Sequence, residues 1–152
     1  MMISLVNIRD AMAALLKSAY PDWKVHFDNV ERPHAPYFYV ELDQRTRSVD
    51  DVCSERSIAV VISAVLPQDR AGRVSRRELF EIADRLDGLI RPVFRVKDRA
   101  ITVLDGRSTI VDDILHYYFD LNFVDAVEVA PVDKMEELEF GLTMKGMNVN
   151  GE

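Results

Sequence analysis

Two aspartates and a histidine stand close together in the chain, in a pattern that could do metal or acid–base chemistry. On a β-strand, whose side chains alternate with a period of two, Asp112 and His116 would share one face and could hold a divalent ion. The run around Asp113 supplies no third well-placed ligand, and a turn followed by a solvated strand face explains the same residues. We therefore predict no metal and no cofactor, and keep a metal-dependent enzyme using Asp112 and His116 as the least favoured alternative.

The other reactive residues lack the neighbours that catalysis needs. Cys53 is the only cysteine, which excludes an intramolecular disulfide, and its acidic neighbours disfavour a nucleophilic thiolate. His26 and His34 flank a proline loop without a ligand pattern around them. The glycines form neither a dinucleotide-binding motif nor a P-loop, and no GxSxG turn is present.

Three consecutive aromatic residues, Tyr37, Phe38 and Tyr39, precede an arginine-bearing segment and could stack on bases. A strand that enters an exposed hairpin has the same composition. The chain carries 19 basic and 26 acidic residues, a net charge of −7, and this balance argues against a dedicated nucleic-acid binder. We expect no specific nucleic-acid partner.

The charge is unevenly distributed. Residues 125–152 hold seven acids and two bases, a net of −5, and residues 1–124 carry only −2. Twelve arginines fall between Arg45 and Arg107. Arginine pairs bidentately with carboxylates and tolerates interface burial better than lysine, so an arginine-rich middle and an acidic end suit subunits that dock heterologously. Ion pairs within one chain, on a solvated surface, are the alternative.

The length of 152 residues suits one domain, and an apolar fraction of 48% is enough for a core. No stretch reaches 18 consecutive apolar residues, and no basic segment followed by an apolar one marks a secretory signal. We expect a soluble, intracellular protein with no membrane partner.

Helical spacing and capping residues predict two helices. The first begins at Ser4 and continues to about Tyr20, and the second begins at a capping box of Ser75 and Glu78 and continues to about Arg91. Strands are predicted over residues 24–30, 37–42, 56–65, 93–96, 100–103, 108–111 and 114–124. Residues 58–65 are nearly all apolar, which is typical of a strand covered on both faces.

The strongest strand pattern lies at residues 114–124, where apolar and polar residues alternate. A single register places the apolar set in the core, and the preceding strand would pair with it through a turn at Asp112 and Asp113. The polar residues 43–55 form either a mobile loop or a hairpin extension that leaves the domain body. The predicted core set is Leu115, Tyr117, Phe119, Leu121 and Phe123.

We divide the chain into a single α+β domain over residues 1–130 and an acidic amphipathic C-terminal arm over residues 131–152. Residues 137–145 of the arm alternate as in a strand, although a helix over 132–138 competes with this interpretation. Leu138, Phe140 and Leu142 share the apolar side. That side must be buried in its own core or in a neighbour's.

The order and lengths of these segments resemble the phage tail terminator family, small proteins that cap the tail tube. The resemblance covers about residues 2–145. It rests on the opening segment MISLVNIRDAMAALLKSAYPDWKVHFDNVE, the strands PYFYVEL and RSIAVVISAVLP, the helix SRRELFEIADRLDGLI and the closing DILHYYFDLNFVD.

The resemblance implies an α+β fold, two helices on a mainly antiparallel sheet, and a homo-oligomeric ring, typically of six subunits. It further implies partners in the tail-tube protein and in the head or connector protein, and a place in the virion tail after assembly in the bacterial host's cytoplasm. It implies no chemistry. From charge and patterning we single out Arg45, Arg47, Leu138, Phe140 and Leu142 as subunit-interface residues. A small-ligand- or partner-binding α+β protein is the leading alternative.

Overall fold

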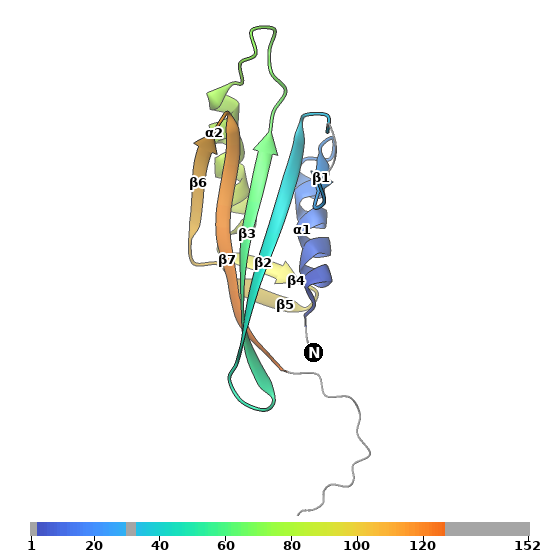
Figure 1. Ribbon diagram of the computed structural model, residues 1–152, viewed down its shortest axis with the longest axis vertical. Coiled ribbons are helices and arrows are strands. Elements are labelled where there is room, and N and C mark those ends of the chain that lie inside the picture. Colours follow the sequence, from blue (N-terminus) through green and yellow to red (C-terminus); the bar gives the residue numbers. More distant parts are fainter. Residues whose placement is uncertain (1–2, 30–32, 127–152) are drawn as a thin grey trace, which may run out of the picture.

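The computed structural model describes residues 3–29 and 33–126. Their elements confirm the predicted α+β fold (Figure 1). In chain order they are α1 (Leu5–Ala19), β1 (Lys24–His26), β2 (Tyr37–Ser48), β3 (Cys53–Val65), α2 (Arg76–Ile90), β4 (Val93–Val96), β5 (Arg99–Thr102), β6 (Gly106–Val111) and β7 (Ile114–Ala126).

Five strands form the main sheet in the order β1-β2-β3-β7-β6, and β4 and β5 form a separate two-stranded sheet. Only the β1–β2 pair is parallel, so the main sheet is mainly antiparallel. The predicted turn between β6 and β7 is confirmed, with Asp112 at φ 53° and Asp113 at φ 60°. Such left-handed backbone angles at both central residues match the twist of a two-residue hairpin.

The two helices begin and end near the predicted residues. Ser4 caps α1 through a full capping box with Asn7, whose side chain accepts from the Ser4 N–H. Ser75 caps α2 by accepting from the Glu78 N–H, at 3.3 Å. The predicted capping box of Ser75 and Glu78 is therefore only half present, because no return bond from the Glu78 side chain forms.

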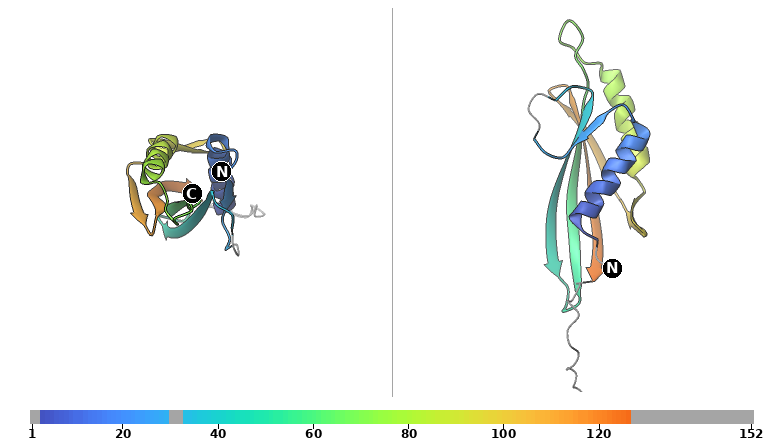
Figure 2. Two further views of the ribbon diagram at one scale, coloured as in Figure 1. Left: turned by 90° about the horizontal axis from the view of Figure 1, so that it is seen from above. Right: turned by 90° about the vertical axis from the view of Figure 1, so that its right-hand side faces the viewer.

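Both helices lie against one face of the sheet (Figure 2). Each buries a stripe with helical spacing, which includes Ile8, Met12 and Leu16 on α1 and Leu79 and Leu86 on α2. The alternating set on β7 meets these stripes, so the predicted register of β7 is confirmed. All five members are buried: Leu115, Tyr117, Phe119, Leu121 and Phe123.

Strand β3 is covered on one face only, so the prediction of two covered faces is wrong. Ile58, Val60 and Ile62 are buried beneath the helices, whereas Ala59 is exposed and Val61 half-exposed on the other side. The continuous apolar run reflects the β-branched residues that a strand favours on either face.

Residues 43–55 form a hairpin extension and not a loop, because β2 and β3 stay paired from Tyr37↔Val65 out to Ser48↔Ser54. The first predicted strand is shorter than expected, since β1 ends at His26. Val30, its predicted end, and the predicted arm over residues 131–152 lie outside the described residues.

Candidate assembly surface

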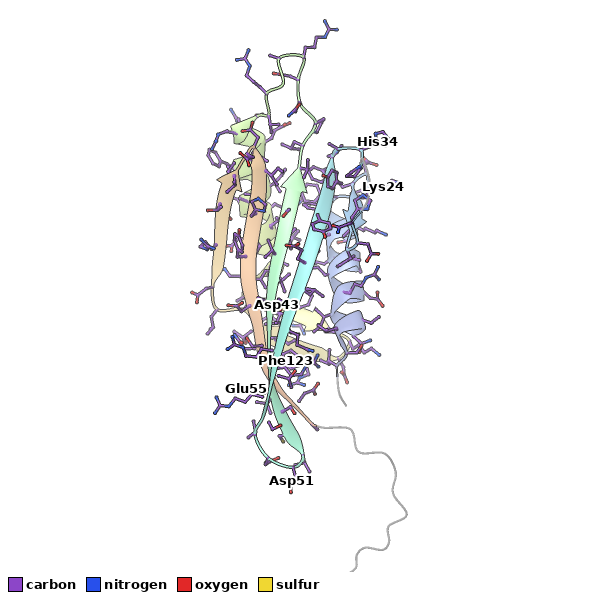
Figure 3. The ribbon with its side chains drawn as sticks, viewed as in Figure 1. Lys24, His34, Asp43, Asp51, Glu55 and Phe123 are labelled. Atoms are coloured by element: carbon purple, nitrogen blue, oxygen red, sulfur yellow. The ribbon has the colours of Figure 1, made fainter. Side chains whose placement is uncertain are left out.

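The hairpin extension reaches beyond the end of the sheet body, away from the two helices (Figure 1). Figure 3 shows Asp51 at its far end, with Asp43 and Glu55 nearer the sheet body and Lys24 and His34 at the opposite end of the molecule. Every residue from Asp43 to Val52 is exposed. A strand pair without an apolar covering gains little from burial, so this segment offers its surface to a partner.

A compact four-residue turn closes the extension. The Asp50 carboxylate accepts from the N–H groups of Val52 and Cys53, both at 2.8 Å, and the Val49 N–H donates to the Cys53 carbonyl at 3.0 Å. Val49 and Val52 are exposed at the tip. The turn therefore presents two apolar side chains, one on either side of the acidic pair Asp50 and Asp51.

Two predicted interface residues, Arg45 and Arg47, lie on β2 within this extension. By the register they share the sheet face that the helices leave open, opposite Ser57 and Glu55 on β3. Arg47 reaches Glu55 at 4.0 Å, and both side chains are exposed. A pair of this kind is worth at most about 1 kcal/mol, so both arginines remain available to a partner.

A buried carboxylate at the base of the extension pairs with two arginines. Asp125 on β7 accepts from the Ile3 N–H at 2.8 Å and pairs with Arg99 at 2.9 Å and with Arg56 at 3.4 Å. Both guanidiniums also stack over Phe123, with distances of 5.1 and 5.2 Å to its ring centre. Asp125 belongs to the acidic end of the sequence, so for this carboxylate the intrachain alternative is correct.

The open face of the sheet carries a shallow groove of about 400 Å³. Within it the Ser63 hydroxyl and His116 Nδ1 lie 2.9 Å apart, and the Tyr39 hydroxyl donates to Asn29 at 3.1 Å. In a catalytic serine–histidine pair, the histidine acts as the base and a third group orients its imidazole. In the described ranges no carboxylate hydrogen-bonds to His116.

The structure does not place Asp112 and His116 on one strand face, as the metal alternative requires. Asp112 and Asp113 form the turn before β7, so Asp112 does not share an extended strand face with His116. Within residues 3–29 and 33–126, no group of three or more His, Cys, Asp or Glu side chains could hold a metal ion. Cys53 is a free, half-buried thiol.

The remaining predicted interface residues, Leu138, Phe140 and Leu142, lie outside the described residues. Sequence reasoning missed the cluster of Asp125 with Arg56 and Arg99, here called the Asp125 cluster. The cluster had one signal, an acid in an otherwise apolar-alternating strand end, but its partners lie 26 and 69 residues away in the chain. No helix in the described part of the chain is long and apolar enough to cross a membrane.

The fold is that of a small α+β protein whose sheet extends into an exposed hairpin. A family model described as phage tail terminator protein matches residues 7–133. The chain belongs to the phage tail terminator family, whose members are structural proteins of the virion tail.

Other comparisons add little. No curated protein matches the chain in sequence. One solved structure aligns with 86% of this chain and 100% of its own, at 18% sequence identity and a TM-score of 0.46. Family membership therefore rests on the family model alone.

Proposed function

We propose that this chain caps the phage tail tube as a homo-oligomeric ring, typically of six subunits, and presents a docking surface to the head or connector protein. The tail-tube protein is its second partner, assembly takes place in the host cytoplasm, and the chain carries no catalytic activity. The observation that carries the proposal is the family match over residues 7–133.

The interface residues we propose are Arg45 and Arg47 on the hairpin extension and Leu138, Phe140 and Leu142 in the arm. The exposed extension supports the first pair. The arm set would contribute about 1.5–3 kcal/mol for each fully buried side chain. The acidic arm would then lie near arginines of a neighbouring subunit, and salt would weaken that contact by screening.

Deletion of residues 132–152 tests the arm. We expect a folded protein that no longer forms rings and no longer caps purified tails, as judged by native mass and by electron microscopy of tail tips. Deletion of residues 146–152 is the matched control, because it keeps the alternating stretch, and it should assemble normally. Normal assembly of the longer deletion contradicts the role of the arm; a failure to fold places the arm in its own subunit's core.

Limited proteolysis tests the extension. Trypsin should cut at Arg45 or Arg47 in the free protein, because both are exposed on a strand pair without apolar cover. Assembled tails should resist cutting at these residues. Equal cutting in both states argues against an interface there.

The groove beside Ser63 and His116 supports one alternative, a small-ligand- or partner-binding protein. A monomer at micromolar concentration that is absent from the tips of purified tails would favour this alternative over the ring.

A further inference from the structure

Strand β6 leaves one long edge of the main sheet open. It is the last strand on its side of the sheet, and nothing pairs with its outer edge in the described part of the chain (Figure 1). The opposite edge strand, β1, has three residues, whereas β6 has six and contains no proline or lysine. Long edges without such protection are templates for a further strand.

The hairpin register fixes which backbone groups point outward. The two-residue turn makes Val111 and Ile114 a hydrogen-bonded pair, so the bonds to β7 alternate from there along β6. Ser108 and Ile110 fall on the alternate positions. Their N–H and C=O groups therefore face the open edge, ready to pair with an added strand.

Helix α2 lines the same edge with an exposed aromatic residue. The side chain of Asp87 lies against Gly106, where an added methyl group would come within 2.6 Å of Asp87 Oδ1. Phe80 precedes Asp87 by seven residues, so it lies on the same side of α2, about 10.5 Å towards the N-terminus of the helix. This part of α2 runs alongside β6 (Figures 1 and 2), and Phe80 is 56% exposed.

Three arginines lie near this edge of the sheet. Arg76 and Arg77 precede Phe80 by four and three residues, so they lie on its side of the helix and both are exposed. Arg107 on β6 stacks over Tyr118 at 4.4 Å and forms no ion pair within the described ranges. The edge thus combines free backbone groups, an exposed aromatic ring and three exposed arginines, of which Arg77 also pairs with Glu81 at 3.8 Å.

The chain itself contains a segment with the complementary pattern. Residues 137–145 alternate, with Leu138, Phe140 and Leu142 on one side and acidic residues Glu137 and Glu139 on the other. If residues 137–145 paired with β6 as an added strand, their apolar side would cover Phe80 and Ile110 on the helix-covered face of the sheet. Their acidic side would face Arg107 on the open face.

The direction of β7 bears on which subunit receives this arm, because the strand carries the chain away from β6 of its own subunit. Gly106, at the start of β6, pairs with Phe119 on β7. Beyond this pair β7 continues through residues 120–126, so its end lies about 23 Å past the start of β6. In its own subunit the arm would have to reverse and return that distance. In a closed ring of heterologous contacts each subunit gives one arm and receives one, so no edge stays open.

We infer that the open edge of β6, together with Phe80 and the adjacent arginines, binds the C-terminal arm of a neighbouring copy as an added strand. The inference builds on the proposed ring, and it names the surface that receives the arm.

Two pools of subunits test the direction of exchange, both with Cys53→Ser. One pool carries Thr109→Cys on the outer face of β6, and the other carries Glu139→Cys or Thr143→Cys in the arm. Mixed under oxidising conditions, with and without tail-tube protein, they should form a disulfide-linked dimer at least tenfold more abundantly than a pool with Lys24→Cys on β1. Dimers at the level of the Lys24→Cys control overturn the inference, as does a disulfide that forms only within a chain carrying both cysteines.

A proline variant tests the backbone pairing. Ser108→Pro removes an outward N–H and no bond to β7, so it should abolish the cross-link, whereas Ser108→Ala should retain it. If Ser108→Pro cross-links as well as Ser108→Ala, added-strand pairing is wrong; if it fails to fold by circular dichroism, the cysteine pools decide alone. Tail capping by the same samples separates the two proposals. Capping without the cross-link rejects only the edge site, and the cross-link without capping rejects only the terminator role.

Discussion

The sheet body and the hairpin extension belong to the same strands, yet they differ in what holds them. In the body, β3 and β7 bury alternate side chains beneath two helices, and Ile58, Leu121 and Leu115 have no exposed surface or almost none. In the extension the same ladder continues to Ser48↔Ser54, but residues 43–52 are all exposed.

This difference shows that backbone pairing between strands and side-chain packing in the core contribute separately to stability. A backbone hydrogen bond contributes about 1 kcal/mol net, because unfolded groups bond to water, whereas each fully buried apolar side chain adds about 1.5–3 kcal/mol. The body therefore carries the stability of the fold. The extension keeps its shape at small cost and leaves its surface for contacts.

The largest expected effect is in the body. Phe119 is 4% exposed, so Phe119→Ala should lower the free energy of unfolding by about 3–5 kcal/mol in urea titrations. Val124→Ala, on the same strand but 50% exposed, is the control and should cost less than about 0.5 kcal/mol. A Phe119→Ala loss below about 1 kcal/mol would mean that β7 is not packed as described.

The next effect lies where body and extension meet. Asp125→Asn keeps one acceptor but removes the charge that Arg56 and Arg99 share, so we expect a loss of about 1.5–3 kcal/mol. Asp120→Asn, at an exposed position of the same strand, should change little. Equal effects of the two variants would show that the cluster does not hold the joint.

Much of the body could be predicted from the sequence, because its signals are local. The alternation on β7 decides its register, and Ser4, Pro21 and Pro92 mark helix boundaries. The one-sided burial of β3 could not be predicted from the sequence, because Ala59 and Val61 are as apolar as the residues that lie beneath the helices. Only the helix positions decide which face is covered.

The candidate surface was less predictable. Polar residues 43–55 fit a loop as well as a hairpin, because the extension is held by backbone pairing that side chains do not encode. The Asp125 cluster and the β6 edge depend on strand order, which joins β7 to β3 and β6 through distant segments. Residue types alone do not specify such neighbours.

A smaller effect on stability is expected at low pH, and it should arise in the sheet body. Arg91 donates hydrogen bonds to Asp87, the Tyr117 hydroxyl adds another at 2.7 Å, and together they hold the pKa of Asp87 below its usual value of 3.8. A lowered carboxyl pKa stabilises the fold above the usual value, and this stability is lost as the pH falls through the folded pKa. Unfolding measured from about pH 6 to about pH 2 should therefore show a shallower acid loss for Asp87→Asn than for the unmodified protein. Identical slopes would exclude Asp87 as an acid-sensitive tie between α2 and the sheet.

The smallest effect on stability is expected in the extension itself. Arg47 and Glu55 are exposed and 4.0 Å apart, so Arg47→Ala should change the free energy of unfolding by less than about 0.5 kcal/mol. If the extension serves contacts between subunits, the same variant should lower the fraction of ring on native mass spectrometry, and Arg47→Lys should restore part of it at low salt. Arg9→Ala, at an exposed position on α1, is the matched loss of one arginine and should leave assembly unchanged. An Arg47→Ala protein that assembles as well as Arg9→Ala would show that exposure of the extension does not mark an interface, and the contrast between body and extension would then concern stability alone.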